Sequence, residues 1–172
     1  FVGGNIEDED FRELLVRWFA WGAFCPVFRM HGERSPWYER EQEFIDNVRQ
    51  LTSGQDNEVW SFGEDNYEIL KKYLFVRENM RPYIRECMRA ASETGAPVMR
   101  PLFFDFPEDK KCWETEDVYM FGPDVLVAPV MELGARERTL YLPKGAEWKD
   151  AISGKLYEGG QTITVDAPLS VI

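Results

Sequence analysis

The spacing of apolar residues changes once along the chain, and this change limits the folds that are open to it. Up to about residue 95, apolar side chains recur mainly at helical intervals, and beyond it short β-type segments alternate with Gly and Pro. The pattern predicts an α/β part followed by an all-β part, without an internal repeat. We expect a first domain over residues 1–120 and an incomplete second domain over residues 121–172.

Two segments of the first part have the period of an amphipathic helix. One spans about residues 8–21, and the other spans about residues 64–93 and ends at Gly95. Pro82 should kink or divide the second helix, because proline lacks a backbone donor and clashes with the preceding turn. The apolar face of the first helix consists of Phe11, Leu14, Leu15, Trp18 and Phe19, and that of the second of Tyr67, Leu70, Leu74, Ile84, Met88 and Ala91.

Other local patterns predict helix starts, strands and turns. Ser61 and Glu64 have the spacing of a capping box, which would start the second helix. Residues 24–28 form a short apolar run that is typical of a strand buried on both faces. Gly159 and Gly160 are typical of a hairpin turn. Further strands are expected within residues 97–106, 119–122 and 125–130, and the all-β pattern continues through residues 140–143, Trp148 and residues 159–165.

Composition excludes several classes of protein. Of the 172 residues, 44% are hydrophobic and 15% aromatic, which is far more than a disordered tail contains. The formal charge of −11 would repel a phosphate backbone, so nucleic acid is not an expected partner. Apolar runs are shorter than the ~20 residues of a membrane-spanning helix, so no membrane partner is expected either.

The cysteines, the histidine and the chain ends carry further expectations. Cys25, Cys87 and Cys112 are odd in number and widely spaced, which favours reduced thiols and a cytoplasmic protein. With a single histidine, a structural zinc site is disfavoured, and no cofactor is expected. The start at Phe1 and the apolar end suggest a segment cut from a longer protein. The oligomeric state is open, with a homo-oligomer as one alternative.

A series of short motifs occurs in a fixed order along nearly the whole chain. They read WFAWGAFCPVF followed by RMHG, then WSFGE, RPYI, PVMRPL, MFGPD, LVAPV, YLP, GGQ and DAPL. Each motif is weakly specific by itself. The ordered series resembles glycoside hydrolase family 31, the α-glucosidase and α-xylosidase family.

The resemblance implies the C-terminal part of a (β/α)8 TIM barrel followed by a proximal β-sandwich-like domain. A complete barrel needs about 250 residues, so this chain cannot contain one. The family activity is retaining hydrolysis of α-glycosides, here with release of glucose or xylose from oligosaccharides, by an Asp nucleophile and an Asp acid/base. Both family motifs would lie upstream of Phe1, so no catalytic residue is assigned to this chain. The implied partners are the substrate and the remainder of the same enzyme.

Three residues are candidates for substrate binding. By the resemblance, His31 donates a hydrogen bond to a hydroxyl of the sugar to be cleaved, at a strand-to-loop position on the C-terminal face of the barrel. Arg29 could orient a neighbouring carboxylate, although a structural ion pair is an equal alternative. Asn5 stands where the family has an apolar wall residue and Phe1 where it has Asp; Asn5 could bind a sugar hydroxyl or simply lead into the helix.

The remaining candidates have simpler alternatives. Trp37 and Trp60 could stack on sugar faces, but packing is the more common role of tryptophan. Asp105, Glu108 and Asp109 could form an acid and base pair, although solvated turn residues are favoured. Met80, Met88 and Met99 are expected in the core. As alternatives to an enzyme, the sequence leaves open a non-catalytic carbohydrate-binding or structural module and a degenerate family member.

Overall fold

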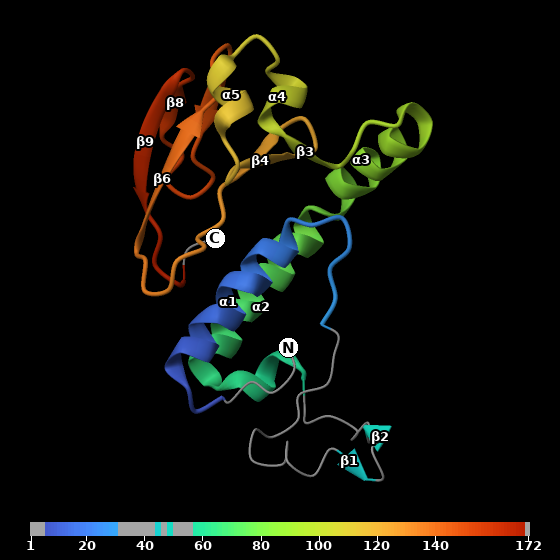
Figure 1. The fold of residues 1–172 in the computed structure, drawn as a ribbon, viewed down its shortest axis with the longest axis vertical. Coiled ribbons are helices and arrows are strands. Elements are labelled where there is room, and N and C mark those ends of the chain that lie inside the picture. Colours follow the sequence, from blue (N-terminus) through green and yellow to red (C-terminus); the bar gives the residue numbers. More distant parts are fainter. Residues whose placement is uncertain (1–5, 31–43, 46–47, 50–56, 171–172) are drawn as a thin grey trace.

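The computed structural model describes residues 6–30, 44–45, 48–49 and 57–170. Figure 1 shows a helical part, whose first two long helices lie below a β-rich part and whose last helix lies beside it. The elements of the helical part are α1 (Glu9–Ala23), β1 (Phe44–Ile45), β2 (Val48–Arg49), the 3-10 helix η2 (Val59–Phe62), α2 (Glu64–Asn79) and α3 (Arg81–Thr94). Those of the β-rich part are β3 (Met99–Pro101), α4 (Leu102–Asp105), α5 (Lys110–Glu114), β4 (Tyr119–Phe121), β5 (Val125–Val127), β6 (Glu137–Leu142), β7 (Glu147–Lys149), β8 (Leu156–Glu158) and β9 (Gln161–Asp166).

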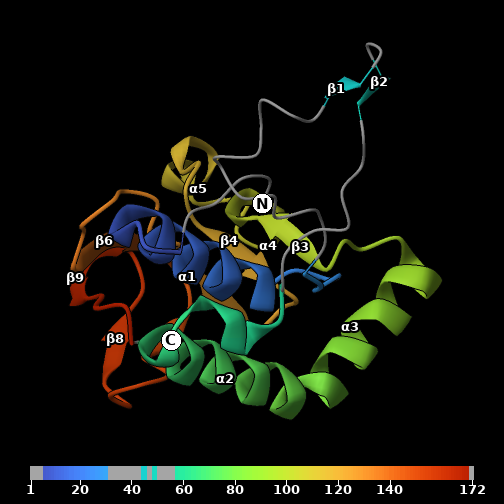
Figure 2. The same cartoon turned by 90° about the horizontal axis from the view of Figure 1, so that it is seen from below.

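The first predicted helix is present as α1, and it packs along α2 (Figure 2). Asp8 caps α1 by accepting a hydrogen bond from the amide of Asp10 at 3.0 Å. The shared core consists of Leu15, Val16, Phe19, Ala23, Phe62, Leu70 and Tyr73. The predicted apolar face is only partly buried, because Leu14 and Trp18 remain about half exposed. Their side of α1 is left uncovered by α2.

The second predicted helix is divided at Pro82, as expected. α2 ends at Asn79, Met80 caps it, and α3 begins with Pro82 in its first turn, where the missing amide costs no helical hydrogen bond. Gly95, with φ of 79°, caps the far end of α3 and donates to the carbonyl of Ala91 at 2.9 Å.

Burial along these two helices differs from the prediction at several positions. Leu70 and Ile84 are buried, whereas Leu74 and Met88 are exposed, so their assignment to the inward face is wrong. Tyr73 takes the inward position instead. Once the helix is divided, α2 and α3 run in different directions, and a single apolar stripe no longer faces a single core (Figure 2).

The predicted capping box is wrong. Ser61 lies inside η2, and its hydroxyl donates to the Glu58 carboxylate at 3.3 Å instead of capping α2. Gly63 is the residue that precedes α2, and it offers no side chain as a cap. The spacing of Ser61 and Glu64 therefore coincides with a 3-10 helix, in which the serine hydroxyl bonds to Glu58 and is not available as a cap.

Residues 24–28 were expected to form a strand, and the structure shows turns and irregular backbone there. A strand needs a neighbour for its amide and carbonyl groups. Within the described part of the chain, the amides of Phe24 and Cys25 donate to carbonyls at the end of α1, and side chains donate to two carbonyls of the segment. Arg77 donates to the carbonyl of Pro26, and the Tyr119 hydroxyl donates to that of Phe24.

The β-rich part contains one three-stranded sheet and two two-stranded ladders. Antiparallel strands β3, β4 and β5 form the sheet, with Arg100 opposite Met120 and Met120 opposite Leu126. The expected strand over residues 97–106 is only partly present, since α4 follows β3 directly. Leu102, Cys112, Val118, Met120 and Tyr141 form the local core.

The two ladders are nested along the chain. β6 pairs with β9 over six residue pairs, and β7 pairs with β8 between them. The Gly159 and Gly160 pair is therefore not a hairpin turn, because β8 and β9 belong to different ladders. Their amides donate to the carbonyls of Ala146 and Leu142, which fixes the corner between the two ladders.

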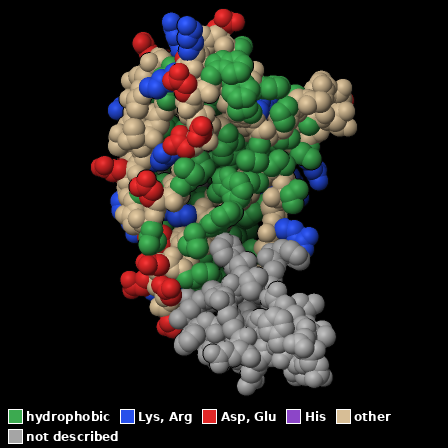
Figure 3. All heavy atoms as spheres, viewed as in Figure 1, with side chains coloured by type: hydrophobic (Ala, Val, Ile, Leu, Met, Phe, Trp, Pro, Cys, Tyr) green, Lys and Arg blue, Asp and Glu red, His purple; other side chains and the backbone are tan. Residues whose placement is uncertain are grey.

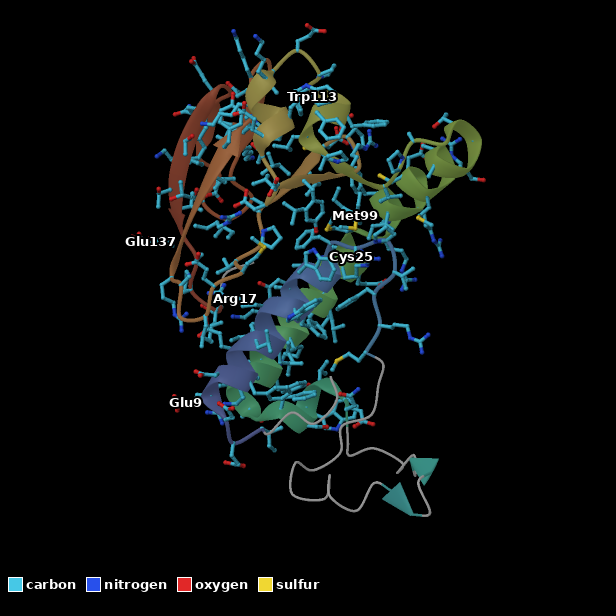
Figure 4. The ribbon with its side chains drawn as sticks, in the orientation of Figure 1. Glu9, Arg17, Cys25, Met99, Trp113 and Glu137 are labelled. Carbon is cyan, nitrogen blue, oxygen red and sulfur yellow. The ribbon has the colours of Figure 1, made fainter. Side chains whose placement is uncertain are left out.

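An ionic cluster joins α1 to the β-rich part. Glu13 is buried, and its carboxylate accepts two hydrogen bonds from Arg136, at 2.7 and 2.9 Å, and one from the amide of Gly134. Arg17 donates to the carbonyls of Ala135 and Ala167, and it reaches from α1 toward the β-rich part in Figure 4.

Candidate functional site

A cleft of about 490 Å³ lies beside the C-terminal half of α1. The irregular segment of residues 25–30 forms one wall, and α1 forms the other. Most of the lining is aromatic or aliphatic, with Arg29 and Asn57 as its polar side chains among the described residues. Such a mostly apolar cleft with a few polar groups is typical of small-molecule sites.

Arg77 of α2 is hydrogen-bonded to the backbone of this wall and of the end of α1 that precedes it. Its guanidinium donates to the carbonyls of Ala23, at 2.8 Å, and Pro26, at 2.9 Å. The rings of Phe28 and Phe121 lie 5.9 and 5.8 Å from the guanidinium carbon, within the range of cation–π contacts. Burial lowers the pKa of Arg77, but arginine remains charged at any physiological pH.

Cys25 is a buried residue of the wall that lines the cleft. Its buried thiol donates to the carbonyl of Trp21 at 3.5 Å, and burial raises the pKa of the thiol. The thiolate is therefore disfavoured, and Cys25 acts as a small apolar residue. All three cysteines are free and buried, as the sequence indicated.

The predicted substrate-binding residues are only partly visible. His31 and Asn5 lie outside the described residues, as does Trp37. Arg29 is exposed and lines the cleft, two residues before His31 in the sequence. Trp60 lies on η2 and is 67% exposed, so it does not fill the core.

The acidic turn forms structural contacts. Asp105 pairs with Arg100 at 2.9 Å. Asp109 accepts hydrogen bonds from the Tyr141 hydroxyl, at 2.7 Å, and from the amides of Lys144 and Lys111. Burial alone would raise the pKa of Asp109, but these hydrogen bonds bring it below its usual value. Asp105 and Asp109 are thus bonded into the fold and are not simply solvated, whereas Glu108 is exposed, as expected for a solvated turn residue.

Two sets of tertiary contacts have no local signal in the sequence. The role of Arg77 is not predictable from the sequence, because its carbonyl partners are Ala23, at the end of α1, and Pro26, in a segment that is expected to be a strand. Glu13 and Arg136 were missed because ion pairs between distant segments leave no local pattern. Met88 is exposed instead of buried, whereas Met80 and Met99 pack against the core beside Phe121.

Comparison with known sequences assigns both parts of the chain. The glycosyl hydrolases family 31 TIM-barrel domain matches residues 2–86, and the glycosyl hydrolase family 31 C-terminal domain matches residues 95–172. The chain therefore belongs to glycoside hydrolase family 31, as a TIM-barrel portion followed by the C-terminal domain. The boundary that we expect between the two domains, near residue 120, stays a prediction.

Relatives and solved structures agree with this assignment. The chain is 33% identical to an α-xylosidase of Saccharolobus solfataricus over 172 residues and 39% identical to α-glucosidase 2 of Bacillus thermoamyloliquefaciens over 171 residues. A family 31 α-xylosidase from a soil metagenome, complexed with xylose, is 52% identical, with a TM-score of 0.88 over 99% of this chain. A xylosidase from Aspergillus niger is 34% identical, with a TM-score of 0.82 over 98%.

The chain is short beside these proteins. It spans 21% and 19% of the two relatives and 25% and 24% of the two solved structures. Among the described residues, no helix is long and apolar enough to span a bilayer.

Proposed function

We propose that the protein containing this chain is a retaining α-glycoside hydrolase that releases glucose or xylose from α-linked oligosaccharides. The observation that carries the proposal is the family 31 match over both parts of the chain. The 52% identity to an α-xylosidase structure complexed with xylose favours an α-xyloside as the first substrate to test.

In this proposal, the segment that forms the cleft wall leads into the substrate-binding residues. His31 donates to a hydroxyl of the sugar, and Arg29 and Asn5 contribute further polar contacts. The position of Arg29 on the cleft supports this reading for the described part of the segment. A sugar suits such a cleft because its apolar face packs on aromatic surface while its hydroxyls need polar partners.

The catalytic carboxylates are proposed to lie in the remainder of the protein. Among the described residues that line the cleft, none is Asp or Glu. Retaining hydrolysis requires two carboxyl groups about 5 to 5.5 Å apart. The isolated 172 residues should therefore bind a glycoside at most, without cleaving it.

The same remainder is proposed to cover an apolar surface of this chain. Trp18, Trp60 and Phe75 of the helical part are at least half exposed, and Val27 is 74% exposed. Hydrophobic side chains gather over the middle of the face shown in Figure 3. An uncovered surface of this kind is typical of a region that packs against another part of a protein.

The test compares activities on p-nitrophenyl α-xyloside and α-glucoside. The full-length protein should cleave at least one of them, and the isolated chain neither. In the full-length protein, His31→Ala should lower kcat/KM about 100-fold, because a lost hydrogen bond to a substrate hydroxyl leaves a polar group unpaired in the transition state. The exposed variant Lys72→Ala serves as the control and should retain full activity.

A covalent adduct separates the enzyme from the alternatives. Mass spectrometry of the full-length protein with a ring-fluorinated glycosyl fluoride, whose anomeric fluoride leaves readily and whose adduct hydrolyses slowly, should show one glycosyl group attached outside residues 1–172. Neither a binding module nor a degenerate family member would form this adduct. Full activity of His31→Ala would remove His31 from the site while leaving the reaction class intact.

A further inference from the structure

We propose that Arg77 is a positioning residue for the sugar site, because its guanidinium fixes the backbone of residues 23–26 and thereby the cleft wall formed by residues 25–30. The inference rests on the proposed function for its link to substrate. The inference that Arg77 fixes the backbone of residues 23–26 depends only on the described contacts.

The first support is the set of groups that Arg77 satisfies. Ala23 is the last residue of α1, so its carbonyl has no helical partner, and Pro26 lies in the bend that follows. Arg77 donates to both carbonyls through separate nitrogens. A cation at this end of α1 is also favoured by the helix dipole.

The second support is the contact of the guanidinium with two aromatic rings. Phe28 comes from the cleft wall and Phe121 from β4, so one side chain connects α2, the wall and the three-stranded sheet. Tyr119, also on β4, adds a hydrogen bond to the carbonyl of Phe24. The wall is thus held to rigid elements by side chains, although it lacks the ladder of a strand.

The third support is the absence of a competing role. Within the described residues, Arg77 forms no ion pair with a carboxylate, unlike Arg81 and Arg89 on α3. Its donors are used on the carbonyls of Ala23, at the end of α1, and Pro26, in the wall. A planar guanidinium can serve two carbonyls at a fixed separation, which a lysine ammonium does less well.

The experiment uses the full-length protein and three variants: Arg77→Met, Arg77→Lys and, as a matched control, Arg81→Met. Arg81 is an exposed arginine that pairs only with Glu78 among the described residues. For each variant, kcat and KM on the preferred p-nitrophenyl α-glycoside are measured well below the Tm. Hydrogen exchange of the amides of residues 22–30 is measured in parallel.

Arg77→Met should raise KM about tenfold and change kcat less than about threefold, because a displaced wall weakens contacts made in both ground and transition states. The amides of residues 22–30 should exchange faster. Arg77→Lys should give an intermediate KM, and Arg81→Met should match the wild type. Arg77→Lys also keeps the test valid where Arg77→Met fails to fold.

An unchanged KM in a folded Arg77 variant would overturn the proposal, because a residue that supports stability alone lowers the Tm without altering the KM of the folded enzyme. If the wild-type protein cleaves no α-glycoside, the proposed function fails instead. The exchange measurement then decides the backbone part: faster exchange in Arg77→Met supports it, and unchanged exchange refutes it.

Discussion

The carboxylate of Glu13 illustrates how single side chains hold the two parts of this chain together. It is buried on α1, and its hydrogen-bond donors, Arg136 and the amide of Gly134, lie in the β-rich part. The Arg136 hydrogen bonds lower its pKa, although burial opposes them, and Gly134 adds to the lowering. Removing the charge leaves Arg136 and the nearby Arg17 without their counter-ion.

We expect Glu13→Gln to destabilise the protein by about 1 to 3 kcal/mol near neutral pH, the cost of disrupting a partly buried charged hydrogen-bond network. Because the folded-state pKa lies below the usual value of 4.5, the contribution is complete above about pH 4.5 and is lost as the pH falls through the folded-state pKa. Thermal unfolding at pH 7, 4.5 and 3 should therefore show a shrinking difference in Tm between wild type and variant.

The control for this experiment is Glu9→Gln, one turn earlier on α1. The Glu9 side chain is 90% exposed and lies 3.7 Å from Arg12. We expect a change below about 0.5 kcal/mol, because exposed ion pairs contribute little. A Glu13→Gln difference that stays constant from pH 7 to 3 would contradict the assigned role of the Glu13 charge.

At the scale of elements, the turn between β4 and β5 is fixed by contacts with α3. Gly122 has φ of 65°, and its amide donates to the carbonyl of Val98 at 2.7 Å. The hydroxyl of Tyr83 donates to the carbonyl of Phe121 and accepts from the amide of Asp124. Burial raises the pKa of Tyr83 to about 12, so the phenol remains a donor at physiological pH.

Gly122→Ala should destabilise the protein by about 2 to 4 kcal/mol, since a left-handed backbone and a steric clash both oppose the new methyl group. A Cβ at this position would lie 2.2 Å from the Tyr83 hydroxyl and 2.5 Å from the Cys87 sulfur. Thermal unfolding measures the effect. Gly134→Ala is the matched control, because Gly134 has a similar φ of 74° and no atom within 4 Å of a new Cβ.

For this comparison, Gly134→Ala should cost about 1 kcal/mol, the backbone contribution alone. Equal destabilisation of the two variants would show that the contact with Tyr83 and Cys87 adds nothing.

The elements differ in how well the sequence predicts them. The division of the second helix at Pro82 and its end at Gly95 were predictable, because both signals act within one turn. The strand expected over residues 24–28 was not, because an apolar run does not specify whether a neighbouring strand is present. The capping box failed for a similar reason: Ser61 has a local partner, Glu58, within η2.

At the scale of the whole molecule, the order of helical and β-rich parts was predictable from the change in apolar period, and the family from the ordered motifs. Of the candidate site, only the residues that belong to a sequence motif were predictable. Arg29 was found in this way, whereas Arg77 was not, since its role depends on packing between α2, the cleft wall and β4. Contacts of this kind arise from tertiary structure and carry no sequence spacing.

The exposed apolar surface leads to a prediction about the isolated chain. With Trp18, Trp60 and Phe75 at least half exposed, the 172 residues should bind a hydrophobic dye and self-associate in sedimentation velocity. Phe75→Glu together with Trp60→Glu should reduce both effects. The full-length protein is the control and should remain free of dye binding, and a monomeric, dye-silent isolated chain would contradict the proposal that this surface is covered by the remainder.

The nested ladders of the β-rich part bear on the order of folding. β7 and β8 are joined by a short loop, whereas β6 and β9 are separated by the whole inner pair. Once the inner hairpin has formed, the adjacent ends of β6 and β9 are already close. Most of the entropy cost of closing the loop between β6 and β9 has then been met by the pairing of β7 with β8. The pairs of the outer ladder can then form in order, starting at the corner at Gly160. The last pair to form, Glu137 with Asp166, adjoins the loop that carries Arg136.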